Sequence, residues 1–405
     1  MIVLKRIIFP LIFLAVLGSG AASQDTFRQI AQFGNPGEGA RRFSGGREVE
    51  WSKNGKRLMV AFYTSRAQMF DLEVKRPIAP AFRTSGDGQV GFINNEMAYT
   101  ADWTSVRVWN SKTGQQIGKS IPHELREDTI IHPAVSPDGK YIATRTTMKS
   151  FQIWDAATLQ PITREHQLES VIGSLRFSTD NKLLFVRAGG QLYVNQSKSG
   201  ELAAGPFKTG WKFYYFPKQK TLITTERAGE GPTQLVIRST AQAEWPEVHR
   251  SKIAGRLKQI VQLNDNRFFI QATNANYTPE LFTFSMESPD VRTQVKSDSD
   301  RAFDLIVTDD KRRWICSNLR NISCQEFGES EPVWEIRIPA SGYDYRLFSF
   351  GREHFMIHDK QDRLRVHKIS DGSQIWALEG VKRFHVHGRK IAVGNRDGVE
   401  IWTAE

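Results

Sequence analysis

Short segments in which apolar and polar residues alternate recur along the whole chain, and turn residues separate them. The clearest group contains Ala134–Ser136, the turn Pro137–Lys140, and then Tyr141–Thr146 and Phe151–Asp155. That turn combines a proline that presets φ, an aspartate that caps locally and a glycine that tolerates positive φ. Alternation with a period of two predicts β-strands, and no long helical period interrupts it. The pattern therefore predicts an all-β protein of short strands joined by tight turns.

These strand groups form nine repeats. Their spacing is roughly 35 to 47 residues, which is the length of one blade of a β-propeller. The residue assigned to the equivalent position of each repeat is in most cases aromatic or apolar and precedes a polar turn. The nine residues are Phe70, Trp109, Trp154, Asn195, Ile237, Phe284, Phe327, His367 and Trp402. The repeat indicates one ring rather than separate domains.

The last repeat lacks one strand. It contains Arg383–Val386, Lys390–Gly394 and Gly398–Thr403, whereas the alternating segment Thr26–Phe33 has no partner in its own part of the chain. An N-terminal strand that joined the last blade would remove an open sheet edge. We therefore expect this strand to close the ring.

The expected fold is a single large β-propeller over residues 24–405, with eight or nine four-stranded blades. Nine blades would exceed the usual four to eight. The repeats around Ile237 and Phe284 are the weakest, so either the ring has nine blades or one irregular blade has been divided in two.

Two repeats resemble those of the WD-repeat family. Val135–Thr144 followed by Phe151–Asp155 is similar to the second half of such a repeat, and so is Val106–Asn110 with Thr113-Gly114. The resemblance is best over residues 88–207, and elsewhere only the period matches. It implies the propeller fold.

The hydrogen-bonded tetrad of that family is incomplete in this sequence. The third repeat has His123, Thr144 and Trp154 at matching positions, but the turn Met148–Ser150 contains no aspartate. We therefore expect fewer polar networks and a larger share of apolar packing between blades.

A later segment resembles the tryptophan-docking motif of quinoprotein-like propellers. Ile369–Trp376 carries its Gly-x-x-x-Trp pattern, although Lys368 stands where the motif has an acid, and Glu329–Trp334 is a weaker match. The resemblance implies that Trp376 stacks neighbouring blades, which is a structural role.

The first twenty-three residues have the pattern of a cleavable signal peptide. Lys5 and Arg6 precede the apolar run Ile7–Leu17, and the small residues Gly18–Ser23 follow it. An uncleaved anchor is the alternative, but the apolar run is shorter than a membrane span requires. We expect cleavage after Ser23 and an exported, periplasmic or extracellular protein without a membrane span.

The chain is basic, with 55 Lys and Arg against 44 Asp and Glu and a formal net charge of +11. For an exported protein this charge favours attraction to anionic envelope polymers or acidic partners rather than to nucleic acid. The alternative is a solvated surface that only maintains solubility, because the basic residues are scattered. The expected partner is thus an unknown protein or an anionic envelope polymer, bound by a monomer.

The two cysteines, Cys316 and Cys324, flank a short polar segment between two predicted strands. A hairpin centred on Arg320 would place them opposite each other on one face. Because exported proteins meet oxidising conditions, we predict a structural cross-strand disulfide between them.

Motifs for chemistry are scarce. His385 and His387 alternate on one strand near His354, His358 and His367, but nothing supplies further metal ligands. Asp309-Asp310 and Glu329/Glu331 lie in predicted turns, where acids are usually solvated. The sequence therefore indicates no catalytic residue, no cofactor and no metal site.

We expect a non-catalytic interaction scaffold, because a closed ring is rigid and presents large loop faces. The alternative is a propeller enzyme, either a quinoprotein-like oxidoreductase or a glycan-acting hydrolase or lyase. Its site would lie in the central channel, where residues from several blades converge without any local spacing.

Overall fold

The structure, a computed structural model, describes residues 27–34, 46–62, 65–84, 88–102, 105–122, 133–146, 149–210, 212–227, 233–253, 256–273, 279–288, 292–294, 304–317, 321–329, 331–337, 345–394 and 398–404. The predicted signal peptide, residues 1–23, lies outside these residues. The described residues form strands and turns and include no helix able to cross a membrane.

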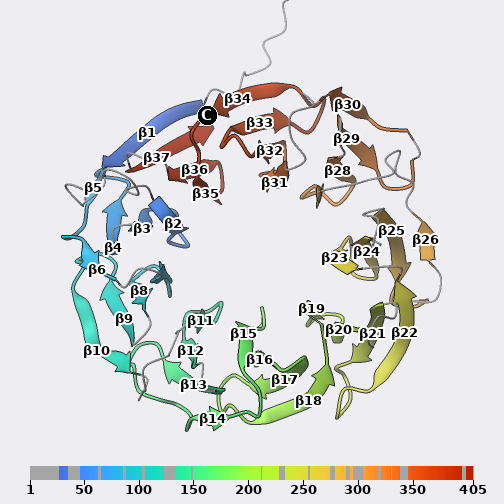
Figure 1. Cartoon of the computed structure of the whole chain (residues 1–405), viewed down its shortest axis with the longest axis horizontal. Helices are drawn as coiled ribbons and strands as arrows, with labels where there is room; N and C mark the ends of the chain where they lie inside the picture. The colour runs from blue at the N-terminus through green and yellow to red at the C-terminus, as the bar shows by residue number, and fades with distance from the viewer. Residues whose placement is uncertain are drawn as a thin grey trace, which may run out of the picture.

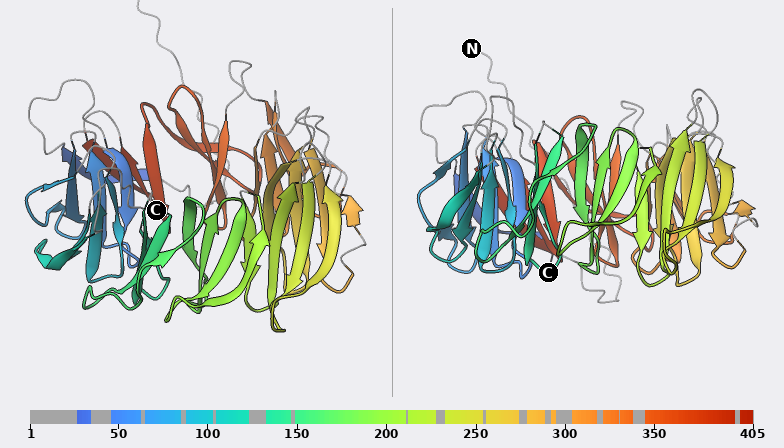
Figure 2. Two further views of the ribbon diagram at one scale, coloured as in Figure 1. Left: turned by 60° about the horizontal axis from the view of Figure 1, so that its bottom comes forward. Right: turned by 90° about the horizontal axis from the view of Figure 1, so that it is seen from below.

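Nine antiparallel sheets stand side by side around a central axis (Figure 1). Seen from the side, the ring is one sheet tall, with loops at both ends (Figure 2). The protein is therefore a nine-bladed β-propeller, which confirms the predicted fold and resolves the number of blades. The two irregular repeats are each a complete four-stranded sheet.

Each blade begins at the axis and proceeds outward along the chain. The innermost strands are β2 (Gly46–Trp51), β7 (Gln89–Phe92), β11 (Ala134–Val135), β15 (Ile172–Phe177), β19 (Phe213–Phe216), β23 (Arg256–Gln262), β27 (Asp304–Val307), β31 (Arg346–Phe350) and β35 (Arg383–His387). The second strands are β3 (Arg57–Phe62), β8 (Met97–Ala101), β12 (Tyr141–Arg145), β16 (Leu183–Ala188), β20 (Thr221–Arg227), β24 (Arg267–Thr273), β28 (Arg313–Ser317), β32 (His354–His358) and β36 (Lys390–Gly394).

The third strands carry the repeat residues. They are β4 (Arg66–Asp71), β9 (Ser105–Asn110), β13 (Ser150–Asp155), β17 (Gln191–Gln196), β21 (Thr233–Ser239), β25 (Pro279–Ser285), β29 (Asn321–Glu326), β33 (Leu364–Lys368) and β37 (Gly398–Ala404). The outer strands are β10 (Gln116–Pro122), β14 (His166–Gln167), β18 (Leu202–Lys208), β22 (Glu247–Ile253), β26 (Arg292–Gln294), β30 (Trp334–Arg337), β34 (Gln374–Leu378) and β1 (Phe27–Gly34). In the first blade, β5 (Arg76–Pro77) and β6 (Phe82–Arg83) both pair with β4.

The predicted repeat position is real and has a structural definition. In seven blades the assigned residue pairs with the second residue of the second strand, as Phe70 pairs with Leu58 and Trp154 with Ile142. Two assignments were wrong. The fifth blade has Arg238 at this position, next to Ile237, and the seventh has Gln325, two residues before Phe327.

The N-terminal strand closes the ring as predicted. β1 pairs antiparallel with β37 from Phe27 opposite Ala404 to Gly34 opposite Gly398, and thereby becomes the outer strand of the ninth blade. Because the two ends of the chain share one sheet, no blade is left with an incomplete set of strands.

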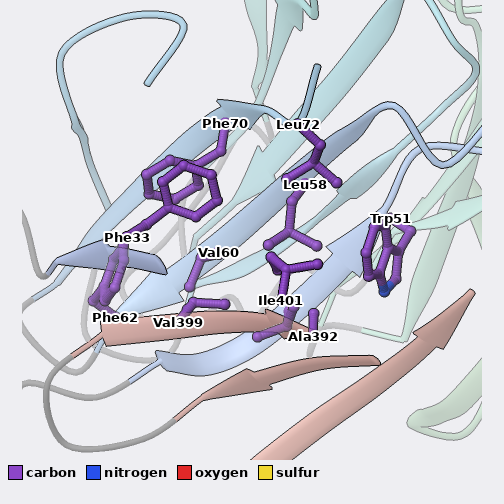
Figure 3. Close-up of a cluster of buried hydrophobic side chains, with 11 residues drawn as sticks. Phe33, Trp51, Leu58, Val60, Phe62, Phe70, Leu72, Ala392, Val399 and Ile401 are labelled. Atoms are coloured by element: carbon purple, nitrogen blue, oxygen red, sulfur yellow. The ribbon is translucent and has the colours of Figure 1, made fainter. Parts of the chain in front are cut away.

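The core lies between adjacent blades rather than inside any one of them. On β3, Leu58 and Val60 face the ninth blade, whereas Met59 and Ala61 face the second. Figure 3 shows the first of these layers, in which residues of β1, β36 and β37 meet β2, β3 and β4. Since neighbours cover both faces, the second and third strands are apolar on both sides instead of alternating.

The tryptophans of the second and third blades donate hydrogen bonds to threonines. The Trp154 indole Nε1 donates to Thr144 Oγ1 at 2.8 Å, and the Trp109 Nε1 donates to Thr100 Oγ1 at 3.0 Å. His123 lies outside the described residues. These bonds join the second and third strands within a blade, so they do not link one blade to the next.

Outer-strand tryptophans dock onto the following blade. The Trp334 Nε1 donates to the carbonyl of Ile369 at 2.7 Å, and its ring stacks on Phe355. The ring of Trp376 stacks in the same way on Phe27 of the closing strand. The structural role predicted for Trp376 is consistent with this geometry.

Candidate functional site

The first residues of neighbouring innermost strands lie next to one another at one end of the ring. The Arg145 guanidinium, at the end of β12, donates to the carbonyl of Ile172, the first residue of β15, at 2.6 Å. The backbone N–H of Leu347 in β31 donates to Asp304 Oδ2, at the start of β27, at 2.7 Å. Because every blade has the same strand order, residues at this level come from all around the axis. We call this level the inner rim.

Basic side chains gather on the inner rim between the third and eighth blades. We call this set the basic rim; it consists of Arg145, Arg187, Lys212, Arg256, Lys258 and Arg346. Lys212, Arg256 and Arg346 are exposed, whereas the others are partly buried. No two of these six residues are close in sequence except Arg256 and Lys258, so the propeller fold rather than the local sequence places them at one end of the ring.

The charges of the basic rim repel one another. Burial and the nearby charges of Lys258 and Arg256 lower the pKa of Lys212. Burial and the charge of Arg187 lower the pKa of Arg145 in the same way. Lysine and arginine nevertheless remain protonated near neutral pH. The carboxyl group of Asp304, on the same rim, lies near Arg346 and Lys258, so basic groups outnumber it without being fully neutralised.

Several of these side chains are held in place rather than free to swing. The Lys212 Nζ donates to the carbonyl of Lys258, which joins the fifth and sixth blades. Nearby, the Arg176 guanidinium lies 4.1 Å from the centroid of the Phe213 ring and donates to the Phe213 carbonyl at 3.2 Å. The cations are therefore partly preorganised, which lowers the entropy cost of binding an anion.

A cavity that contains two glutamates lies where the ring closes, between blades that the basic rim does not include. Its volume is about 440 Å³, and β2, β7 and β35 line it with Glu48, Val49, Glu50, Gln89, Arg383, Phe384 and His385. It therefore lies between the ninth, first and second blades, and it exists only when the two ends of the chain are joined.

Glu50 is the most perturbed acid in this cavity. Burial and the neighbouring charge of Glu48 raise its pKa to about 7. Its Oε2 lies 3.6 Å from the His385 Nδ1, which is too long for a hydrogen bond. Burial and the charge of His387 lower the pKa of His385. Near neutral pH the pair is thus a half-protonated carboxyl beside a largely neutral imidazole.

The second blade adds to this environment. The backbone N–H of Val90 donates to Glu48 Oε2 at 3.3 Å, which anchors that carboxylate. Burial and the charges of Glu48 and Glu50 raise the pKa of the Tyr99 phenol. Tyr99 is therefore a neutral phenol near the two glutamates rather than a further acid.

The histidines singled out in the sequence do not converge. His387 stacks on Trp51 with ring centroids 5.7 Å apart, while His385 turns toward Glu50. His358 and His367 bond to the carbonyls of Val381 and Gly372. Within the described residues, no three His, Cys, Asp or Glu side chains come together as metal ligands.

The acids singled out in the sequence have turn roles. The Thr308 hydroxyl donates to Asp310 Oδ1 at 2.6 Å, and Asp309 accepts a hydrogen bond from Ser349 at 3.1 Å. Glu329 and Glu331 are exposed. The acids that do form a site, Glu48 and Glu50, were not singled out; their only sequence signal is two glutamates on one face of a strand.

The structure does not bring the two cysteines together. Cys316 pairs with Ser323, and Cys324 pairs with Ile315, so the thiols point to opposite faces of the sheet. Neither is in a disulfide bond. The predicted centre of the hairpin on Arg320 is wrong because Ser317 pairs with Ile322, which moves the register by one residue.

No protein-family model and no curated protein matches the sequence. Solved structures do match. A eukaryotic initiation factor has a TM-score of 0.58 at 12% identity, over 83% of this chain and 95% of that one. The dihydro-heme d1 dehydrogenase NirN has a TM-score of 0.54 at 13% identity, over 87% and 78% of the two chains.

BamB from Moraxella catarrhalis has a TM-score of 0.51 at 12% identity, over 78% of this chain and 96% of that one. Identities this low show a shared fold and nothing about a shared activity. These likenesses support the β-propeller fold described above and nothing finer.

Proposed function

We propose that the protein is an exported, non-catalytic scaffold that binds an anionic partner on its basic rim. The observation that carries this proposal is the convergence of Lys212, Arg256 and Lys258 from two blades. Like charges this close cost free energy in the unbound protein, and an anion that neutralised them would recover it.

The location and the nature of the partner follow from the sequence. The expected signal peptide at residues 1–23 supports export, and a net charge of +11 supports anionic partners. In the envelope or outside the cell, such partners are acidic proteins and anionic polymers. The ring supplies a rigid support, so binding requires little ordering of the backbone.

The test is binding of fluorescein-labelled poly-L-glutamate, followed by anisotropy. The combined variant Lys212→Gln, Arg256→Gln and Lys258→Gln should bind about tenfold more weakly at low salt. Raising the salt from about 50 mM to about 300 mM should weaken the wild type more than this variant, because salt screens exposed charges.

The matched control removes three exposed lysines away from the rim, Lys119, Lys198 and Lys218. The control variant has the same change in net charge, so it should bind like the wild type. If both triple variants lose affinity equally, only overall charge matters and the rim is not the binding site.

An enzyme is the alternative, and one observation favours it. Glu50 titrates near neutral pH beside Glu48, and a pair of carboxyl groups is what most glycoside hydrolases use. Of the described residues that line the cavity, none is a serine, threonine, cysteine or lysine. Release of reducing ends from envelope glycans by the wild type, and its loss in Glu50→Gln, would support this alternative over the scaffold.

A further inference from the structure

The cavity at the ring closure contains two carboxyl groups, which the basic rim lacks, together with Arg383 and His385. Glu48 and Glu50 extend from β2, Gln89 from β7, and His385 from β35. With a volume of about 440 Å³, the cavity is within the range of small-ligand sites, which run from about 300 to about 1,000 Å³. It is large enough for one long side chain of another protein.

Glu50 lacks a strong counter-charge in the unbound protein. Among the ion pairs of the described residues, its one partner is His385, at 3.6 Å. The titratable and charged groups that face it are Glu48 on its own strand, Tyr99 on β8, and Arg383, His385 and His387 on β35. Arg383 is exposed at the mouth of the cavity and forms no ion pair with Glu50 among the described contacts.

We infer that this cavity accepts the ammonium or guanidinium group of a protein partner. The partner would then place acidic residues on the basic rim and one lysine or arginine between Glu48 and His385. This inference rests on the proposed scaffold function and narrows its partner to a protein segment that carries both charges. A purely anionic polymer has no group for the cavity.

The charge of Glu50 links this interaction to pH. A cation binds the ionised carboxylate, and burial with the charge of Glu48 keeps the Glu50 pKa at about 7. The ionised fraction therefore rises about tenfold between pH 6 and pH 8. His385 acts in the same direction, because losing its proton removes a competing positive charge.

The experiment uses the full protein labelled with 13C at the glutamate carboxyl carbons and observed by NMR. The probe is N-acetyl-lysine methylamide, and the Glu50 resonance is the one that Glu50→Gln removes. We expect a saturable shift of the Glu48 and Glu50 resonances, with affinity about tenfold higher at pH 8 than at pH 6. Glu50→Gln should abolish saturation at Glu48, whereas the exposed control Glu353→Gln should retain it.

Three results would overturn the inference. The first two are the absence of a saturable shift at either pH, and the same shift with an equal concentration of sodium chloride. The combined rim variant of Lys212, Arg256 and Lys258 separates this failure from failure of the scaffold proposal. It should bind poly-L-glutamate about tenfold more weakly and still bind the lysine probe with unchanged affinity. If it loses the probe as well, the cavity is not an independent subsite and the inference fails.

Discussion

The aromatic ring of Phe27 stacks on the indole of Trp376, with centroids 4.9 Å apart and planes inclined by 21°. Phe27 is at the start of the closing strand, and Trp376 is on the outer strand of the eighth blade. The contact therefore joins the N-terminal strand to a blade other than the one whose sheet it completes. It fixes the closing strand from two directions, by hydrogen bonds along β37 and by stacking on β34.

Phe27→Ala should destabilise the whole ring. Burial of Phe27 is partial, so we expect a loss of about 2 kcal/mol, below the 3 to 5 kcal/mol of a fully buried phenylalanine. Urea unfolding followed by tryptophan fluorescence measures this, and the exposed Gln32→Ala on the same strand is the control. Equal stability of the two variants would mean that the Phe27 ring does not stabilise the closure of the propeller.

Thr144→Val should cost about 2 kcal/mol, because it leaves the buried Trp154 Nε1 without its 2.8 Å acceptor. Thr144→Ser keeps the hydroxyl and loses only a methyl group, so its cost should be about 1 kcal/mol. Equilibrium unfolding of both variants in urea decides the matter. A serine variant as unstable as the valine variant would show that the methyl group, and not the hydrogen bond, matters.

Both cysteines should titrate as thiols when the protein is unfolded without reductant. In the folded protein, labelling should be slow, since burial raises the pKa of Cys324 to about 12 and only the thiolate reacts. Ellman's reagent with and without denaturant provides the measurement. Absence of thiols in the unfolded, unreduced protein would restore the disulfide predicted from the sequence.

Glu50→Gln should stabilise the protein at alkaline pH. The folded pKa is about 7 against an ordinary value of 4.5, so the folded state holds its proton to higher pH than the unfolded state does. The wild type therefore loses stability progressively above pH 4.5, and the loss is complete above pH 7.

The side chain is 37% exposed and solvent screens it, so the gain at pH 8 should be about 1 kcal/mol. Unfolding free energies of the wild type and Glu50→Gln at pH 4 and pH 8 test this, with Glu353→Gln as control. A constant difference between wild type and variant at both pH values would contradict the raised pKa.

The sequence predicted the ring closely because its signals are local. Alternation within Tyr141–Thr146 depends on residues a few positions apart, and so does the Pro-Asp-Gly turn before it. The period and the unpaired segment Thr26–Phe33 then led to eight or nine blades and to closure by the N-terminal strand, and the structure decided for nine. The assignments were wrong at Ile237 and Phe327. The repeat positions of these blades hold the polar residues Arg238 and Gln325, so an apolar or aromatic residue one or two positions away was assigned instead.

The site was not predictable in the same way. Lys212 and Lys258 are 46 residues apart, yet the Lys212 Nζ reaches the Lys258 carbonyl. In sequence such lysines are scattered charges, because nothing local indicates that both lie at the same level of the inner rim. The register of the cysteine hairpin was missed for a related reason: a register change of one residue turns every side chain of a strand to its other face.

The sequence by itself determined the strands, their repeat and the way the ring closes, since short-range alternation and turn chemistry specify them. Only the tertiary structure decided where charge accumulates. Closing nine blades places Arg256 beside Lys212 and encloses Glu50 between the last blade and the first two. Electrostatic interactions depend on distance in space, and in a propeller that distance is set by the rotation from blade to blade rather than by separation along the chain.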